Sequence, residues 1–501
     1  MASNWAHLKD IVRIKGGKRL PKGSSLQAEP NDHPYIRVRD MGDKQIPRVG
    51  LEFVPDDVFP MIKNYIVEEN DVIVSIVGSV GLVSVIDQHF HLASQTENCA
   101  KLSGLDRSDA DYLYYCLTSP LGQREIAVQT VGAVQPKLPL YGIENIQVPW
   151  PDKPVRYTLA SFLNSLDDKI ELNRQINATL ESMAQALFKS WFVDFDPVID
   201  NALAAGNPIP EPLQARADKR AALLAAASAA DTRSASAMDN AHPTQTAAHT
   251  QPGTTAPATP LQPLPADLRA LFPDSFVFNE EMGWVPEGWE VKAMGAFCQQ
   301  AIGGQWGEDV ADAGLVPAVC LRGVDMDHLR VNGIAKKAPI RYIKDSALEK
   351  RLMTDNDFLI AASGAGPCGR PLWCSDMIQS GFQHPVIYSN FVKRFTAKSK
   401  EAAIYIDRLI FNKYSDGSIG DFITGTSVPN LDAKGLLAGL YITMPSVEVL
   451  KRFASFQMLY CSKLYSKECH TLEELRDALL PKLLSGQIQI PEAEKMAAEA
   501  L

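Results

Sequence analysis

Motifs that mark catalytic or metal-binding proteins are missing from this sequence of 501 residues. The segment Gly420–Ser427 has the glycine spacing of a Walker-A loop, but threonine replaces the lysine that would bind phosphate. No Asn-Pro-Pro-Tyr/Phe, G-x-S-x-G or H-E-x-x-H pattern occurs. We therefore predict no catalytic residues and no metal site, and a chain that binds and organises other molecules.

Paired cysteines and long apolar runs are also missing. The eight cysteines form no C-x-x-C pair and no His/Cys cluster of zinc spacing, so we expect reduced thiols in a cytoplasmic protein. No apolar run approaches the roughly 20 residues that a membrane-spanning helix needs. The first residues, MASNWAHLKD, do not have the pattern of a signal peptide. We expect no contact with a membrane.

The chain has little positive charge overall, with a net charge of -10. Taken alone, this argues weakly against nucleic acid as a partner. Net charge averages over surfaces with different roles, however, and the first 48 residues carry ten Lys/Arg against five Asp/Glu. This basic segment fits either phosphate contact or an ordinary solvated face.

Between Ala221 and Pro265 there is no Ile, Val, Phe, Trp or Tyr, and Ala, Thr, Pro and Ser dominate. Such a segment cannot bury enough apolar surface to offset its chain entropy. We predict a linker over residues 200–283, with a short helix over Pro212–Ala230.

Two long helices are predicted from apolar periodicity. Residues Pro154–Asp194 carry an apolar stripe at three- and four-residue steps, and Val447–Ser485 carry a second one, ending near Gly486. Polar residues interrupt both at mid-length, and Asn173 is expected to fix the register of an antiparallel pair. Two separate surface helices are the alternative. The residues assigned to the helix pair or to partner contacts are Leu159, Leu166, Asn173, Leu180, Leu187, Trp191, Leu472, Leu475, Leu479 and Leu483.

The sequence also repeats itself outside the helices. Arg37 and Asp40-Met41 match Arg322 and Asp325-Met326 at one offset, and Asp71 and Gly78 match Asp357 and Gly364. We match Ser94-Gln95 with Ser389-Asn390 in the same way. Strands are expected over residues 35–38, 71–77 and 81–86, and helices over 110–118 and 121–128.

These patterns predict an α+β protein in which two repeated mixed α/β domains are joined by two long antiparallel coiled-coil helices. The expected boundaries are 1–150 for the first domain, 151–199 for the central helix, 200–283 for the linker, 284–446 for the second domain and 447–492 for the C-terminal helix.

This order resembles the DNA specificity subunit of type I restriction–modification systems. The resemblance is carried by Pro34–Met41, by the helix signature Leu187–Phe192, by the turn Val285–Trp289 and by the ending Leu479–Gly486. The Ala/Thr/Pro-rich insert is longer than the usual connector of that family.

The resemblance implies that each domain is a target recognition domain for one half of a bipartite double-stranded DNA site. The helices would set the half-site spacing and bind two methylation subunits, and restriction/translocase subunits would join the complex. S-adenosylmethionine, ATP and Mg²⁺ would be bound by those partner subunits, because the chain itself would be a non-catalytic member of a restriction endonuclease and adenine methyltransferase. A helical adaptor for protein partners, and a self-contained restriction–methylation enzyme, are the competing hypotheses.

Candidate DNA contacts follow from side-chain chemistry, because Arg can bind guanine O6 and N7, and Asn or Gln can bind adenine. Arg13, Lys15, Lys18 and Arg19 are expected to contact phosphates. Arg37 and Arg322 could instead be structural partners of Asp40 and Asp325. The candidates are Arg13, Lys15, Lys18, Arg19, Arg37, Arg39, Lys44, Ser79 and Gln95 in the first domain, and Arg322, Arg370, Ser389 and Asn390 in the second.

Overall fold

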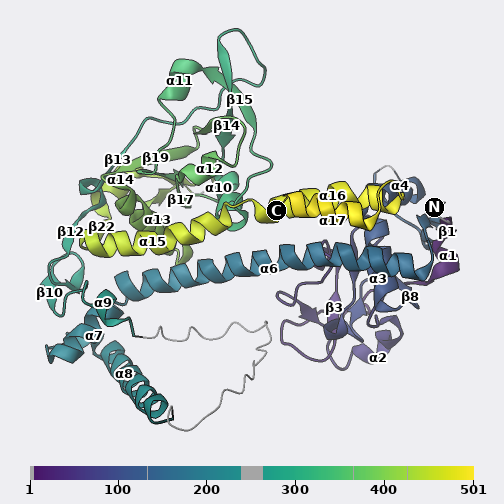
Figure 1. The fold of residues 1–501 in the computed structure, drawn as a ribbon, viewed down its shortest axis with the longest axis horizontal. Coiled ribbons are helices and arrows are strands. Elements are labelled where there is room, and N and C mark those ends of the chain that lie inside the picture. Colours follow the sequence, from purple (N-terminus) through teal and green to yellow (C-terminus); the bar gives the residue numbers. More distant parts are fainter. Residues whose placement is uncertain (1–4, 133, 238–262, 365, 426, 501) are drawn as a thin grey trace. The chain divides into compact units, whose positions relative to one another are not determined.

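The computed structural model describes residues 5–132, 134–237, 263–364, 366–425 and 427–500 (Figure 1). The chain divides into two compact units. Unit 1 contains Met1–Asn173 and Glu468–Leu501, and unit 2 contains Arg174–Lys467. The helix α6 (Lys153–Phe192) contributes to both units.

Unit 1 is built on a four-stranded antiparallel sheet in the order β2-β8-β5-β6. Its central strand β5 is buried on both faces, as its sequence Val-Ile-Val-Ser suggests. A three-stranded sheet, β4-β3-β7, and a pair, β1-β9, complete the strands. The strands are β1 (Trp5–His7), β2 (Arg13–Gly16), β3 (Pro34–Ile36), β4 (Glu52–Phe53), β5 (Val72–Ser75), β6 (Val83–Val85), β7 (Ser94–Gln95), β8 (Cys99–Ser103) and β9 (Gln147–Pro149).

Helices cover the strands of unit 1. The longest of them before α6 is α3, which begins where the Asp106 side chain accepts a hydrogen bond from the Asp109 backbone. The helices are α1 (Leu8–Ile11), η1 (Val38–Asp40), α2 (Phe59–Ile62), η2 (Lys63–Tyr65), η3 (Gln88–Phe90), α3 (Arg107–Thr118), α4 (Pro120–Gln129), α5 (Leu140–Asn145), α16 (Glu468–Leu484) and α17 (Ile490–Ala500). The helices expected over residues 110–118 and 121–128 are confirmed within α3 and α4. The three expected strands are present but shorter, and β3 ends at Ile36 because Val38 begins η1.

Unit 2 repeats this plan. Its four-stranded sheet has the order β13-β19-β16-β17, its three-stranded sheet has the order β15-β14-β18, and β12 pairs with β22. Two small hairpins, β10-β11 and β20-β21, are added. The strands are β10 (Phe276–Asn279), β11 (Gly283–Pro286), β12 (Glu290–Ala293), β13 (Cys298–Gln300), β14 (Leu315–Leu321), β15 (Ile340–Lys344), β16 (Asp357–Ala361), β17 (Pro371–Trp373), β18 (Val386–Tyr388), β19 (Val392–Ala397), β20 (Ile423–Thr424), β21 (Asn430–Leu431) and β22 (Tyr441–Met444).

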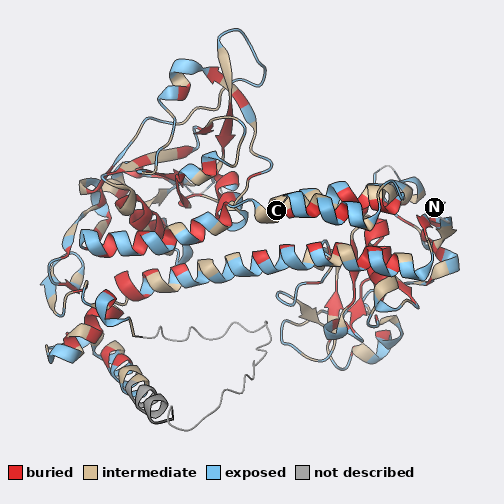
Figure 2. Cartoon of the chain, in the orientation of Figure 1, coloured by how far each residue is buried: buried red, intermediate tan, exposed pale blue. Residues whose placement is uncertain are grey.

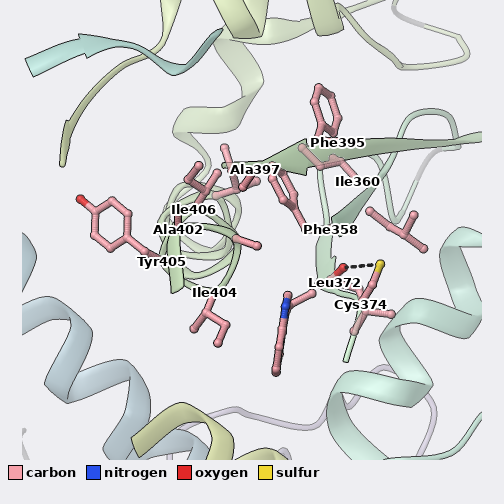
Figure 3. Close-up of a cluster of buried hydrophobic side chains, with 14 of the residues drawn as sticks. Phe358, Ile360, Leu372, Cys374, Phe395, Ala397, Ala402, Ile404, Tyr405 and Ile406 are labelled. Atoms are coloured by element: carbon pink, nitrogen blue, oxygen red, sulfur yellow. Dashed lines mark hydrogen bonds between the residues drawn. The ribbon is translucent and has the colours of Figure 1, made fainter. Parts of the chain in front are cut away.

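The core of unit 2 lies between its large sheet and the helix α13 (Figure 3). Phe358 and Phe395 stack on neighbouring strands, and Tyr405 on α13 donates a hydrogen bond to the Thr443 carbonyl. The helices are α7 (Asp196–Ala205), α8 (Glu211–Ala237), α9 (Ala266–Arg269), η4 (Met294–Ala296), α10 (Gly323–Asn332), α11 (Asp345–Glu349), α12 (Asp376–Gln379), α13 (Lys400–Ser415), η5 (Ser418–Phe422), α14 (Ala433–Gly439) and α15 (Val447–Leu464).

The central helix is confirmed as one continuous helix, α6, and its buried apolar residues lie in its N-terminal and C-terminal parts (Figure 2). Within unit 1 its N-terminal part packs antiparallel to α16, with Leu159 and Leu166 in the same core as Leu472, Leu479 and Leu483. Within unit 2 its C-terminal part packs against α15. There Phe188, Trp191 and Phe192 contact Phe453. Asn173 is buried, whereas Leu180, Leu187 and Leu475 are partly buried at these cores.

The prediction of one C-terminal helix over residues 447–492 is wrong. α15 ends at Leu464, and Lys467 adopts a left-handed φ of 61° before α16 begins. The segment from Lys467 to His470 offers no apolar residue for the stripe except Cys469, while the preceding Tyr465 is buried in the core of unit 2. α16 then ends before Gly486, whose φ is 71°, as the predicted C-cap requires.

The linker predicted over residues 200–283 is shorter than expected. α7 and α8 are joined by ion pairs from Arg216 to Asp196 and from Arg220 to Asp200, the latter fully buried. The Asn201 amide also donates hydrogen bonds to backbone carbonyls of Arg269 and Phe272. These ion pairs add to the packing of α7, whose Val198 and Ile199 are fully buried. The predicted linker also contains α9 and β10, and its residues 238–262 lie outside the described residues.

Candidate nucleic-acid interface

Unit 1 has a turn, Thr96–Cys99, between β7 and β8, whose ends Thr96 and Cys99 are buried and whose central residues are partly exposed. The Cys99 backbone N–H donates to the Thr96 carbonyl at 3.1 Å and closes the turn. The Thr96 N–H donates to the Ile36 carbonyl at 3.0 Å, and the Ile76 N–H donates to the Asn98 carbonyl at 2.7 Å. Two strands therefore hold the turn, and Glu97 and Asn98 lie at its tip.

Unit 2 contains the same turn, Ser389–Val392, between β18 and β19. The Val392 N–H donates to the Ser389 carbonyl at 3.0 Å, and the Ser389 N–H donates to the Leu321 carbonyl at 2.9 Å. The Ala362 N–H donates to the Phe391 carbonyl at 2.8 Å. All three hydrogen bonds of unit 1 have a counterpart, and we call Thr96–Cys99 and Ser389–Val392 the matched turns.

The matched turns correct the repeat alignment drawn from the sequence. Ile36 pairs with Gln95 in unit 1, and Leu321 pairs with Tyr388 in unit 2. Gln95 therefore corresponds to Tyr388, and Asn390 corresponds to Glu97. The match between Ser94-Gln95 and Ser389-Asn390 is wrong by two residues. A pair of polar residues is too short to determine how the two repeats align.

A glycine stands against each matched turn. A Cβ on Gly17 would come within 3.0 Å of the Thr96 carbonyl, and a Cβ on Gly304 would meet the Ser389 carbonyl in the same way. The next residue then runs beside the preceding strand. The Lys18 N–H donates to the Gln95 carbonyl at 3.0 Å, and the Gln305 N–H donates to the Tyr388 carbonyl at 2.9 Å.

Basic side chains are carried by β2 and by the segment after it, which runs beside the matched turn of unit 1. Arg13 and Lys15 are exposed on β2, and the Lys15 ammonium donates to the Asn64 carbonyl at 2.7 Å. The Lys15 and Lys18 ammonium groups lie 5.0 and 5.6 Å from the Tyr65 ring centroid. The Arg19 side chain is 80% exposed, so these cations are accessible to an anionic partner.

Arg19 and Glu97 form an ion pair on the matched turn of unit 1. Arg19 Nε donates to Glu97 Oε1 at 2.5 Å, and the Thr96 hydroxyl donates to Glu97 Oε2 at 3.1 Å. Partial burial would raise the pKa of the Glu97 carboxyl, but these hydrogen bonds outweigh it and lower the pKa below its ordinary value. The carboxylate is thus ionised and keeps acceptor capacity for a further donor.

Two of the predicted arginines occupy matching structural positions. Arg37 precedes η1 and donates from its backbone and from Nε to Asp40, at 2.9 and 3.3 Å. Arg322 precedes α10 and makes the same two bonds to Asp325, at 2.9 and 2.8 Å. Arg37 also pairs with Glu52. These contacts favour the structural alternative for both residues.

The remaining candidates of unit 1 differ in accessibility. Arg39 is exposed and donates to Glu52 at 3.1 Å, and Ser79 is exposed in the loop between β5 and β6. Lys44 is partly buried and pairs with Asp111 at 3.0 Å, and desolvation lowers the pKa of its ammonium group. Gln95 is only 1% exposed, and its side-chain amide has no hydrogen-bond partner among the described residues.

The candidates of unit 2 are divided in the same way. Ser389 is fully buried, whereas its neighbour Asn390 is exposed at the tip of the matched turn. Arg370 donates to the Tyr414 hydroxyl at 2.9 Å and pairs with Asp327 at 2.7 Å. Phe391, which follows Asn390 in the turn, is 57% exposed. The structure therefore brings Asn390, but not Ser389, to the surface.

Sequence reasoning did not select Glu97, Asn98 or Phe391. A single exposed Glu, Asn or Phe carries no signal by itself. Their common position becomes visible only through the hydrogen bonds that the two units share.

No group of three His, Cys, Asp or Glu side chains in the described part of the chain is arranged to hold a metal ion. No helix in the described ranges is long and apolar enough to cross a membrane.

Burial raises the pKa of the Cys99 and Cys320 thiols to about 12.

Comparison with known proteins gives one family. Residues 3–182 match the family model of the type I restriction modification DNA specificity domain. The specificity subunit of the type I restriction enzyme HindI from Haemophilus influenzae is 26% identical over 70% of this chain and 71% of its own length. The MjaIX specificity subunit from Methanocaldococcus jannaschii is 20% identical over 97% of this chain and 93% of its own length.

A solved structure of a type I restriction–modification S subunit from M. genitalium covers 96% of each chain, with a TM-score of 0.48 at 14% identity.

Proposed function

Because this chain belongs to the specificity subunits of type I restriction–modification systems, we propose that its two units each read one half of a bipartite double-stranded DNA site. The observation that supports this most directly is the pair of matched turns. They share a backbone hydrogen-bond pattern but carry unlike side chains at the tip, which are partly exposed in unit 1 and exposed in unit 2. Two readers of unlike half-sites need such an arrangement, because the scaffold must be common and the reading groups must differ.

The phosphate contacts that we propose come from unit 1. Arg13, Lys15 and Lys18 are exposed along β2 and the segment after it. Lysine and arginine there can neutralise backbone phosphates and make DNA binding depend on salt. Arg39 and Ser79 remain candidate contacts, and Asn390 remains the candidate adenine reader of unit 2.

The chain itself is proposed to be non-catalytic. Two methylation subunits would bind the exposed sides of the helices, and restriction/translocase subunits would complete the assembly. Single large apolar residues suited to such contacts are exposed on α6, including Leu172 and Met183. S-adenosylmethionine, ATP and Mg²⁺ would belong to those partners, and the assembly would work in the cytoplasm. The helices would set the distance between the half-sites.

Domain exchange with mapping of methylated adenines tests this proposal. Residues 1–150 are replaced by the corresponding segment of a relative with another target, and the host genome is sequenced for N6-methyladenine. We expect one half of the methylated motif to change and the other half to persist. A continuous motif, or a motif that does not depend on this chain, contradicts the proposal and leaves the adaptor hypothesis standing.

A further inference from the structure

The matched turns allow the base-reading residues of the two units to be identified, if the proposed function holds. Glu97 corresponds to Asn390, and Asn98 corresponds to Phe391. The correspondence rests on strand pairing as well as on the turn itself, because Ser75 pairs with Cys99 where Ala361 pairs with Val392. The backbone at these positions is therefore equivalent, whereas the side chains differ in charge, shape and polarity.

Residues that both units share near the turns have backbone roles. Gly17 and Gly304 allow a close approach to the turn carbonyls, and Arg37 and Arg322 close the start of a helical turn. Shared residues of this kind cannot distinguish unlike half-sites. Residues that differ on an equivalent backbone can do so where they reach the surface, and the tip residues are partly exposed in unit 1 and exposed in unit 2.

The chemistry at the unit 1 turn combines a donor and an acceptor. Most N–H groups of the exposed Arg19 guanidinium remain available, and the Glu97 carboxylate accepts only two of the hydrogen bonds that it can accept. In the major groove, guanine offers the acceptors O6 and N7, and its partner cytosine offers the N4 amino donor. The ion pair is thus complementary to both bases of one G·C pair.

The chemistry at the unit 2 turn is different. Asn390 presents an exposed carboxamide, and Phe391 presents an aromatic ring that is 57% exposed. A carboxamide can bind adenine N6 and N7 together, and an apolar side chain can contact the methyl group of thymine. These two groups are complementary to an A·T pair.

We propose that Arg19 and Glu97 read a G·C pair in the half-site of unit 1, and that Asn390 and Phe391 read an A·T pair in the half-site of unit 2. In each half-site, the proposal assigns the recognition of one base pair to two residues. Glu97, Asn390 and Phe391 belong to the matched turns, and Arg19 pairs with Glu97. The proposal also removes the buried Gln95 and Ser389 from the set of base readers.

Base-pair substitution within the site of the full chain tests the proposal. The wild-type site is found by methyladenine mapping with the partner subunits present. Competition binding then compares the wild-type duplex with duplexes changed at single positions. For Glu97→Ala we expect the preference for one G·C pair to fall by about 5- to 150-fold, with every other position unchanged.

The controls use exposed residues of the same type in the same unit. Glu69→Ala is the control for Glu97→Ala, and Asn332→Ala is the control for Asn390→Ala. For Asn390→Ala we expect the same size of loss at one A·T pair of the other half-site. The double change Glu97→Asn with Asn98→Phe is expected to shift the unit 1 position from G·C towards A·T.

The outcomes separate this inference from the proposed function. If the wild-type chain directs no bipartite motif, the proposed function fails. If the bipartite motif stands but Glu97→Ala and Asn390→Ala leave every base preference intact, the inference fails alone. A loss of affinity that is equal for all duplexes also overturns it, because that result identifies a phosphate contact. Thermal unfolding checks each variant, and the two units supply independent tests should one variant not fold.

Discussion

Removal of the Glu181 carboxylate on α6 is predicted to destabilise unit 2 strongly. Both Glu181 oxygens accept hydrogen bonds from the Arg408 guanidinium, at 2.6 and 2.8 Å. Arg408 lies on α13 with 1% of its side chain exposed, and a second pair, Arg330 with Asp407, lies beside it. The change Glu181→Gln would leave a buried guanidinium without its counter-charge.

The expected magnitude follows from the pKa of Glu181. Burial would raise this pKa, but the hydrogen bonds and charge of Arg408 outweigh burial and lower it to about 2, from an ordinary value of 4.5. Because the folded-state pKa is depressed, the ion pair stabilises the folded state fully above pH 4.5. That stabilisation is lost as the pH falls from about 4.5 towards 2. A shift of this size corresponds to about 3 kcal/mol of unfolding free energy at neutral pH.

Urea unfolding of the full chain, followed by tryptophan fluorescence, measures the effect. Five of the seven tryptophans lie in unit 2, so the signal reports mainly on that unit. For Glu181→Gln at pH 7 we expect the midpoint to fall by roughly 1 M urea. Asp168→Asn, at an exposed position of the same helix, is the control and should leave the midpoint unchanged.

Replacement of both partners provides the sharper test. Glu181→Leu with Arg408→Met removes both charges and should recover most of the lost stability, because well-packed apolar residues can replace a buried ion pair. The wild-type advantage over Glu181→Gln should also shrink between pH 4.5 and 3. A loss below about 1 kcal/mol at pH 7, or an advantage independent of pH, would refute the reasoning.

Two further predictions concern the matched turns and their surroundings. Lys18→Gln should weaken DNA binding about equally for all sequences and reduce the slope of log affinity against log salt by about 1, which titration at several salt concentrations measures. Gly304→Ala should cost about 1–3 kcal/mol in thermal unfolding, because its Cβ would collide with the Ser389 carbonyl. The neighbouring Gly303→Ala is the control, since nothing lies within 4 Å of that Cβ.

The long helix and the repeat were predictable because they depend on local periodicity. α6 needs only an apolar stripe and the polar residues between its turns, and both are visible in the sequence. The interruption after Leu464 was not predictable in this way. The residues Lys467–His470 break the stripe, but α6 has a similar polar stretch around Asn173 and continues through it. The burial of Tyr465 in unit 2, a tertiary contact, accompanies the break.

The structure of the predicted linker also depends on tertiary contacts that the local sequence does not reveal. Its composition predicts little apolar burial, and α8 indeed contributes few buried apolar side chains among its described ones. The ion pairs Arg216–Asp196 and Arg220–Asp200 span 20 residues, so no short sequence window contains both partners. Charge pairs at that separation are recognised only when the helices have been placed.

Residues that are identical at equivalent positions of the two units are a poor guide to base contact. Asp71 and Asp357 match in sequence, and each accepts a backbone hydrogen bond just before the central strand, from Glu68 at 2.9 Å and from Thr354 at 2.8 Å. Arg37 and Arg322 match for a similar reason. Identity between the two copies therefore marks the scaffold that both must build. If the half-sites are unlike, the readers must be sought where the backbone agrees and the side chains do not, and the matched turns satisfy that condition.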